Sequence, residues 1–305
     1  MTAPATDEEI RDVNERYHDV AAVTYDSKWG IDFGPIGLSQ VEGKLEKVLG
    51  KPVPNLGRVV EIGAGTGYFS LNLLLGGKCE EVVATDISPG MIKTLKANAK
   101  RLGLKVEAHT CEAAELPLED ESVDTVLGHA VLHHLPDLDA AFEEFFRVLK
   151  PGGVLFFGGE PSKLGDQIAN VPKGFARRVS PAWRAALRAR PAPAAHADGS
   201  GSEEEHDLEK FVDVHAFEPK AISAPAMSAG FADVEVVGEE LLANWFGWTN
   251  RALEATADPE DVPMAWRMYA FRGYVALQKV DRALLEGRLP AQIFYNLMVG
   301  ARKPA

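Results

Sequence analysis

The sequence predicts an α/β fold built on a mostly parallel sheet. A β-branched run, VVEI (59–62), ends in the glycine turn GAGTG (63–67), and an apolar helical pattern begins at Phe69. Strand, glycine turn and helix in this order are typical of nucleotide binding. Pro89 and Gly103 then mark the start and end of a second helix. Strands that alternate with helices in this way predict parallel pairing through right-handed crossovers.

The remaining elements follow from the same signals. Thr6 and Glu9 predict a capping box that opens a helix near Asp7. A further helix is expected over 41–49, where Gly50 and Pro52 follow. Strands are expected near 58–63, 81–86, 105–110, 123–128, 153–158, 232–237 and 293–300. Helices are expected near 67–76, 89–102 and 138–149.

The glycine turn and two acids indicate which nucleotide is bound. The dinucleotide fingerprint is G-x-G-x-x-G, but here the third glycine, Gly67, comes one residue early. Glu61 lies just before the turn, where it would repel a pyrophosphate but suits an ammonium group. Asp86 ends the second predicted strand, where an acid can accept both ribose hydroxyls. An adenosine with an ammonium and no phosphate describes S-adenosylmethionine.

Five ordered motifs carry a family resemblance. They are VVEIGAGTG (59–67), ATDIS (84–88), CEAAELP (111–117), VDTVLGHAVLHHLPDL (123–138) and LKPGGVLFF (149–157). Together they resemble the class I S-adenosylmethionine-dependent methyltransferases of the small-molecule type, over roughly residues 55–160. The resemblance implies a Rossmann-like seven-stranded sheet of order 3-2-1-4-5-7-6 with helices on both faces. It also implies the cofactor S-adenosyl-L-methionine.

The resemblance assigns further cofactor contacts. Ile87 is expected to pack on the adenine, and Glu112 to accept from its amine with help from the Ala113 backbone. Glu112 is one methylene longer than the aspartate usual at this position. The complete set expected at the cofactor is Tyr17, Tyr25, Glu61, Gly63, Gly65, Gly67, Asp86, Ile87, Glu112, Ala113 and His129, and Trp29 is a further candidate to line the site. For the three aromatic residues, ordinary core packing is the alternative.

Two histidines are the candidates for catalysis. His133 and His134 follow the fourth predicted strand, and histidine is the commonest general base. One of them is expected to act as base or acceptor ligand; the alternative is a turn histidine that caps a helix or packs on the cofactor. Glu160 and His215 are further pocket candidates. No metal is expected, because His133 stands where metal-binding relatives carry a carboxylate and hard cations prefer oxygen.

The chain divides into a core with two insertions. The expected domains are an N-terminal helical segment that covers the cofactor site (1–54), the cofactor-binding core (55–162), a helical and flexible insertion (163–214), the rest of the core sheet (215–243 and 290–305) and a second helical insertion (244–289). The first insertion has a run of basic residues over 172–191 and a low-complexity loop over 192–209. Met264, Met268, Phe271 and Val275 recur at helical spacing in the second. Both insertions are expected to form a lid; core packing and a solvated basic face are the alternatives.

Composition narrows the function. A net charge of −13 over 305 residues argues against general nucleic-acid binding, which needs a basic footprint. The acidic, polar start and the lack of a long apolar run predict a cytoplasmic protein without stable membrane insertion. We expect methyl transfer to a small molecule, apolar or anionic, most simply to oxygen. Alternatives are a lipid or quinone-like amphiphile as acceptor, and a non-enzymatic cofactor-binding regulator. The acceptor atom and the oligomeric state are open.

Overall fold

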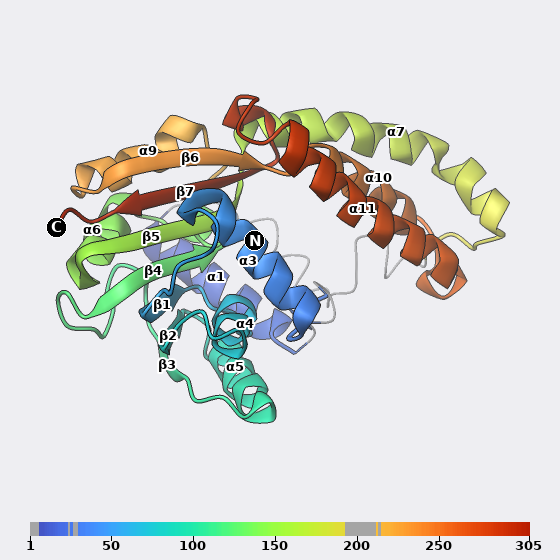
Figure 1. Cartoon of the computed structure of the whole chain (residues 1–305). Helices are drawn as coiled ribbons and strands as arrows, with labels where there is room; N and C mark the ends of the chain where they lie inside the picture. The colour runs from blue at the N-terminus through green and yellow to red at the C-terminus, as the bar shows by residue number, and fades with distance from the viewer. Residues whose placement is uncertain (1–5, 24, 27–29, 193–211, 213–214) are drawn as a thin grey trace. The chain divides into compact units, whose positions relative to one another are not determined.

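The computed structural model describes residues 6–23, 25–26, 30–192, 212 and 215–305 (Figure 1). The chain separates into two compact units, which are described one at a time. The core unit comprises Met1–Glu160, Glu203–Val237 and Met298–Ala305, and the helical unit comprises Pro161–Ser202 and Gly238–Leu297. The predicted loop over 192–209 lies almost wholly outside the described residues, as does Trp29.

A seven-stranded sheet has the order β3-β2-β1-β4-β5-β7-β6, which confirms the predicted fold class. Its strands are β1 (Arg58–Ile62), β2 (Glu81–Asp86), β3 (Glu107–Thr110), β4 (Val123–His129), β5 (Leu149–Pro161), β6 (Ala232–Glu239) and β7 (Asn296–Arg302). The first five strands pair in parallel. The arrow of β7 points opposite to that of β5 in Figure 1, as predicted for a mixed sheet.

One strand is longer than the sequence predicts. β5 was expected near 153–158, starting after Pro151 and Gly152. Instead the Gly152 N–H donates to the Lys303 carbonyl, and the Lys303 N–H donates to the Gly153 carbonyl. The chain end therefore draws the proline–glycine segment into the sheet.

Helices cover both faces of the sheet in the core unit. They are α1 (Asp7–Ala21), α3 (Pro35–Leu49), α4 (Tyr68–Leu75), α5 (Pro89–Leu102), α6 (Leu138–Val148) and α9 (Pro219–Ser228). Right-handed crossovers place α4 and α5 on one face and α6 on the other, and α3 packs on α4 while α6 packs on α9. α3 begins six residues before the predicted helix because Asp32 accepts hydrogen bonds from the Gly34 and Gly37 N–H groups at its start.

Apolar side chains fill the space on each side of the sheet. Leu45 of α3 and Phe69 of α4 pack with Phe156 of β5 in one cluster. Beyond the sheet, Phe145 of α6 stacks on Phe157 with 5.2 Å between ring centroids. Buried strands flanked on both faces in this way have continuous apolar runs, as in Val59 and Val60.

Helix α1 is tied to the core through the start of α5. Thr6 and Glu9 form the predicted capping box. The Asp19 carboxylate accepts hydrogen bonds from the Ser88 hydroxyl at 2.6 Å and from the Gly90 N–H at 2.7 Å. Acids at a helix N-terminus satisfy unpaired N–H groups and complement the helix dipole. α1 is thus held beside the carboxyl ends of the strands.

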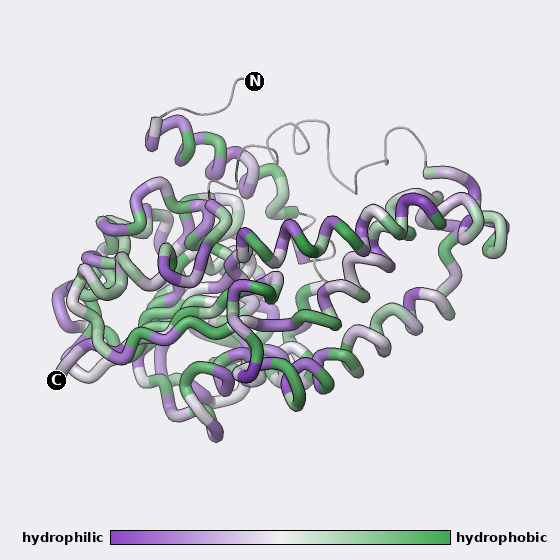
Figure 2. Tube along the Cα trace, turned by 90° about the horizontal axis from the view of Figure 1, so that it is seen from above, coloured by the Kyte–Doolittle hydropathy of each residue, from purple (hydrophilic) through white to green (hydrophobic). Residues whose placement is uncertain are grey.

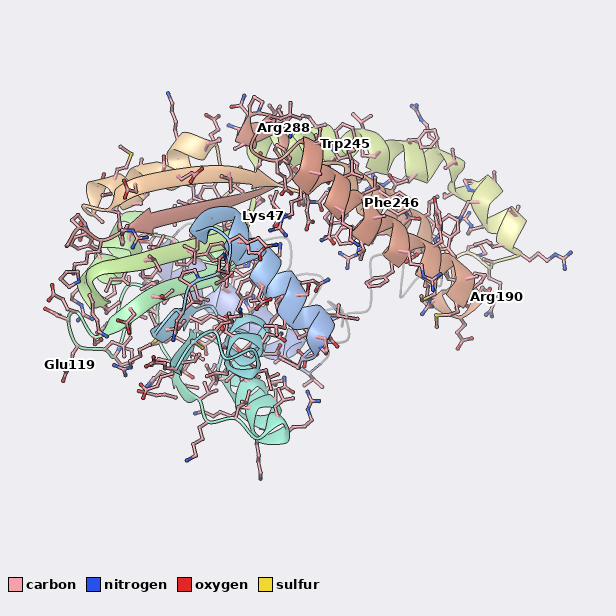
Figure 3. All side chains as sticks on the ribbon, viewed as in Figure 1. Lys47, Glu119, Arg190, Trp245, Phe246 and Arg288 are labelled. Carbon is pink, nitrogen blue, oxygen red and sulfur yellow. The ribbon has the colours of Figure 1, made fainter. Side chains whose placement is uncertain are left out.

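The helical unit consists mainly of α7 (Lys163–Leu187), α10 (Leu242–Glu254) and α11 (Met264–Leu284). α10 packs on both of the others. The ring of Phe246, which is labelled in Figure 3, lies against Gly273 of α11 and meets Tyr269 edge to face. The buried Asp281 of α11 accepts hydrogen bonds from Leu242 N–H and Ala243 N–H, which caps the start of α10.

The predicted apolar stripe of α11 does not form a core. Val275 is half-buried, whereas Met264, Met268 and Phe271 are 67%, 38% and 47% exposed. Figure 2 shows hydrophobic and hydrophilic residues alternating along the helices of this unit. α10 packs elsewhere on α11, through contacts such as Phe246 on Gly273, and so leaves these three side chains uncovered.

Candidate active site

A cavity lies at the carboxyl ends of β1, β2 and β4 in the core unit. This is the edge at which parallel α/β sheets bind ligands. Nine of the predicted site residues line it, namely Tyr25, Gly63, Gly65, Asp86, Ile87, Glu112, Ala113, His129 and His134. Apolar side chains, among them Val131, Leu135 and Ala141, form much of the remaining wall.

Two glycines of the turn have positive φ angles, for different reasons. At Gly63 (φ +60°) a Cβ atom would collide with the Val131 side chain. At Gly65 (φ +54°) a Cβ atom would meet nothing within 4 Å. Gly65 therefore leaves its backbone open to the cavity, whereas Gly63 lets the turn pack against the loop after β4. Gly67 does not line the cavity; it is the N-cap of α4.

Asp86 ends β2 at the cavity and is only 7% exposed. One carboxylate oxygen accepts from the Gly65 N–H at 2.8 Å, and the other accepts from the Ser88 N–H at 2.9 Å. Burial raises the pKa of Asp86, although His18 and these hydrogen bonds act in the opposite direction. Each oxygen keeps a further lone pair, because a carboxylate has about four acceptor sites.

The Glu61 carboxylate lies behind the turn rather than in the cavity wall. It is 2% exposed and accepts the Ser70 N–H at 2.9 Å. Burial raises the pKa of Glu61 to about 8, with the Asp86 charge adding to the effect. The Glu61 side chain therefore does not reach the cavity to contact a ligand directly.

Glu112 lies at the cavity wall and pairs with a residue that the sequence analysis missed. Arg11 of α1 donates to Glu112 at 2.8 Å, and both side chains line the cavity. Asn14 and His18 of the same helix line it as well. The spacing Arg11, Asn14, His18 follows one helical face, so the signal was present in the sequence beside the apolar stripe of Val13 and Tyr17.

The turn after β4 presents His134 to the cavity. Its Nδ1 lies 2.9 Å from the Val212 carbonyl oxygen, which can only accept, so Nδ1 carries the proton and Nε2 the lone pair. Burial lowers the pKa of His134 well below its ordinary value, and the nearby His133 and His18 lower it further. The ring of His18 meets that of His134 edge to face at 5.2 Å.

His133 points to the sheet, not to the cavity. Its Nδ1 lies 2.7 Å from a carboxylate oxygen of Glu160, which is fully buried at the end of β5. The same carboxylate accepts the N–H groups of Val131, Leu132 and His133 at 3.0, 3.0 and 3.1 Å. Glu160 thus fixes the turn on which His134 stands.

The other candidates lie as follows. Burial raises the pKa of Tyr25, at the cavity, to about 12. His129 lines the cavity, and its ring stacks on Phe69 with 5.0 Å between centroids. Tyr17 lies outside the lining and packs with Val13 and Val212, which was the alternative for that residue. His215 also lies outside it, with Nε2 3.0 Å from the Leu135 carbonyl oxygen.

The strand order, the glycine turn after β1 and the buried acid at the end of β2 together define a class I S-adenosylmethionine-dependent methyltransferase fold. Residues 60–157 match the family model described as "Methyltransferase domain". S-adenosyl-L-methionine is the cofactor of this class, as the sequence predicted.

Curated relatives match over part of their length. A malonyl-[acyl-carrier protein] O-methyltransferase from Methylococcus capsulatus is 34% identical over 149 residues, which are 45% of this chain and 53% of that protein. A demethylmenaquinone methyltransferase from Thermus thermophilus is 33% identical over 124 residues, 41% of this chain and 56% of that protein. The matched region thus spans about half of each relative.

Solved structures share the fold at low identity. Phosphoethanolamine N-methyltransferase 2 from Haemonchus contortus, in complex with phosphomonomethylethanolamine and S-adenosylhomocysteine, has a TM-score of 0.59 at 18% identity. The match covers 97% of this chain and 60% of that one. A putative sarcosine dimethylglycine methyltransferase from Galdieria sulphuraria has a TM-score of 0.55 at 16% identity, covering 93% of this chain and 98% of that one.

Proposed function

We propose that this protein transfers the methyl group of S-adenosyl-L-methionine to a small-molecule acceptor, most simply to an oxygen. The observation that carries the proposal is the single cavity wall that holds Asp86, Glu112 and a neutral His134 beside the glycine turn. The residues assigned to the cofactor and the candidate base therefore line the same cavity.

The residues of the cavity fit a cationic nucleoside better than a phosphate. Asp86 keeps acceptor capacity for the ribose hydroxyls, and Gly65 leaves backbone open to the ligand. We assign Glu112 to the adenine amine; the same carboxylate pairs with Arg11 in this structure, so the two donors would share it. We assign His129 to the methionine part of the cofactor. Glu61 acts on the ligand only through the turn and through the charge it gains if a bound cation lowers its raised pKa, since its side chain is behind that turn.

The protein's part in the chemistry is alignment and proton removal. The cofactor supplies a methyl group on a positively charged sulfur, which is a good leaving group. Holding the acceptor in line with that bond can contribute about 7–11 kcal/mol to lowering the barrier. His134 is a candidate to accept the hydroxyl proton at Nε2, because Nδ1 carries the proton of the neutral ring and the lowered pKa keeps the ring neutral at neutral pH. We assign His133 to stabilising the turn, through its hydrogen bond to Glu160, and not to binding the acceptor.

Two features favour an apolar acceptor with a hydroxyl or carboxyl group. The cavity wall includes Val131, Leu135 and Ala141, and the relatives named above include an O-methyltransferase and a quinone-directed enzyme. A lipid or quinone-like amphiphile is the second candidate acceptor. A lid formed by the two insertions, and a cytoplasmic location, remain predictions from the sequence.

The test is release of S-adenosylhomocysteine when the protein is incubated with cofactor and a panel of hydroxyl, carboxyl, amine and quinol acceptors. The His134→Ala variant should lose turnover but keep cofactor binding. A matched control is His109→Ala, since His109 is a partly exposed histidine on β3 that pairs with Glu107 outside the cavity. Cofactor binding without turnover on any acceptor class would favour a non-enzymatic regulator instead.

A further inference from the structure

Helix α11 has an unusual surface for its length. It runs over 21 residues, yet among the described residues its only buried one is Asp281. Helices of soluble proteins normally bury an apolar stripe. Here the stripe of Met264, Met268 and Phe271, spaced four and three residues apart, is exposed. An exposed, continuous apolar stripe of this kind indicates a binding surface.

Basic residues share the exposed side of the same helix. Arg272 and Lys279 lie close in helical angle to Met268, and both are exposed. α11 carries four basic residues and one acid, the buried Asp281 that caps α10. α7 in the same unit carries five basic residues and one acid. Since the whole chain has a net charge of −13, this concentration of positive charge is local to the helical unit.

Aromatic residues also lie at the start of α11, on a different side of the helix from Met268. Trp266 and Tyr269 border an open depression together with Leu187, Pro263 and Ala265. Tyr269 is 54% exposed. Tryptophan and tyrosine rings favour the boundary between lipid headgroups and acyl chains.

We propose that the exposed face of α11, made by Met264, Met268, Phe271, Arg272 and Lys279, docks on an anionic lipid bilayer. A basic amphipathic helix lies in the plane of such a surface, with its apolar side chains about 5–10 Å deep. Charge favours an anionic bilayer over a second copy of this chain, because two copies joined through this same face would bring cations against cations. None of the helices in the described part of the chain is long and apolar enough to cross a bilayer, so the contact is peripheral. The proposal does not depend on the methyl transfer proposed above.

The test is co-sedimentation of the full chain with vesicles of phosphatidylcholine, with and without phosphatidylglycerol. The chain should bind the mixed vesicles and release them in high salt. Arg272→Gln and Lys279→Gln should each weaken binding about fivefold, the contribution typical of one basic residue near an anionic surface. Phe271→Glu should weaken binding at least about tenfold, as expected for loss of a buried aromatic side chain.

A matched control separates the surface from general stickiness. Met227→Glu alters a methionine that is 64% exposed on α9 of the core unit, and its binding should equal that of the wild type. Circular dichroism verifies that each variant is folded. Equal binding to pure phosphatidylcholine, or no binding at all, would overturn the proposal. So would a Phe271→Glu variant that retains vesicle binding and instead loses self-association, affinity for an acidic protein or affinity for the methyl acceptor.

Discussion

Replacement of Glu160 tests the turn that holds His134. The carboxylate is fully buried and accepts four hydrogen bonds, three from backbone N–H groups and one from His133. Glu160→Ala leaves all four donors buried without this acceptor. Removing one partner of a buried ionic pair typically costs about 3–5 kcal/mol. The free energy of unfolding should fall by about this amount, a large part of the roughly 5–15 kcal/mol of a whole domain.

The glutamine variant refines the prediction. Glu160→Gln keeps one acceptor oxygen but loses the charge and the second oxygen, so it should cost about 1.5–3 kcal/mol, the range for a hydrogen bond to a charged group. Urea titration at neutral pH measures both values. Glu119→Ala is the control, because Glu119 is exposed on the surface (Figure 3), and it should stay within about 0.5 kcal/mol of the wild type.

Glu160 should also make the free energy of unfolding depend on pH. Burial alone would raise the pKa of Glu160, but His133 and the backbone N–H groups outweigh it, and the pKa lies below the ordinary value of 4.5. A lowered folded-state pKa means that the stabilisation is complete above pH 4.5 and is lost as the pH falls through the folded-state value. The alanine variant should therefore approach the wild type in acid. If Glu160→Ala unfolds like the wild type at neutral pH, the reasoning about this turn is wrong.

Three further predictions concern the cavity. Gly63→Ala should destabilise the fold by about 2 kcal/mol or more, because its Cβ would collide with Val131. Gly65→Ala is strained by its positive φ but meets no neighbour, so it should cost less stability and chiefly weaken cofactor binding. Urea titration beside calorimetry separates the two, and equal stability losses would contradict the assignment. The pKa of Glu61, which burial raises to about 8, should fall when a cation binds nearby. Calorimetry near pH 7 in buffers of different ionisation enthalpy should therefore detect proton release, and Glu61→Gln should reduce that release. Unchanged release in the variant would remove Glu61 from the electrostatics of the site. Because the pKa of His134 is well below 6.5, kcat should stay level as the pH falls through 6.5 and decline only below it; a decline centred near 6.5 would point to another base.

Local signals accounted for much of the fold. Pro89 and Gly103 predicted the bounds of α5, and the β-branched run predicted β1. The bounds of two elements were wrong by several residues, for different reasons. β5 is extended by its pairing with Lys303, which is distant in the sequence. α3 is extended by the hydrogen bonds of Asp32 to Gly34 and Gly37, a local signal that the prediction did not use.

The residues of the candidate site were likewise predicted only in part. Motif positions placed Asp86, Glu112 and His134 at the cavity, because strand ends in a parallel sheet meet at one edge. Side-chain direction was harder to predict. His133 and His134 are adjacent in sequence, yet only His134 lines the cavity, since Glu160 holds the neighbouring ring. Tyr17 points to an apolar cluster, whereas Arg11 and His18 of the same helix reach the cavity.

Titration calorimetry with S-adenosylhomocysteine tests the central claim most directly. The wild-type chain should bind one equivalent and give no heat with a nicotinamide dinucleotide. Asp86→Ala should weaken the binding by about a hundredfold or more, as expected for two lost hydrogen bonds to a charged group. A chain that ignores the sulfur nucleoside but takes up the dinucleotide, or that binds equally well without Asp86, would contradict the account.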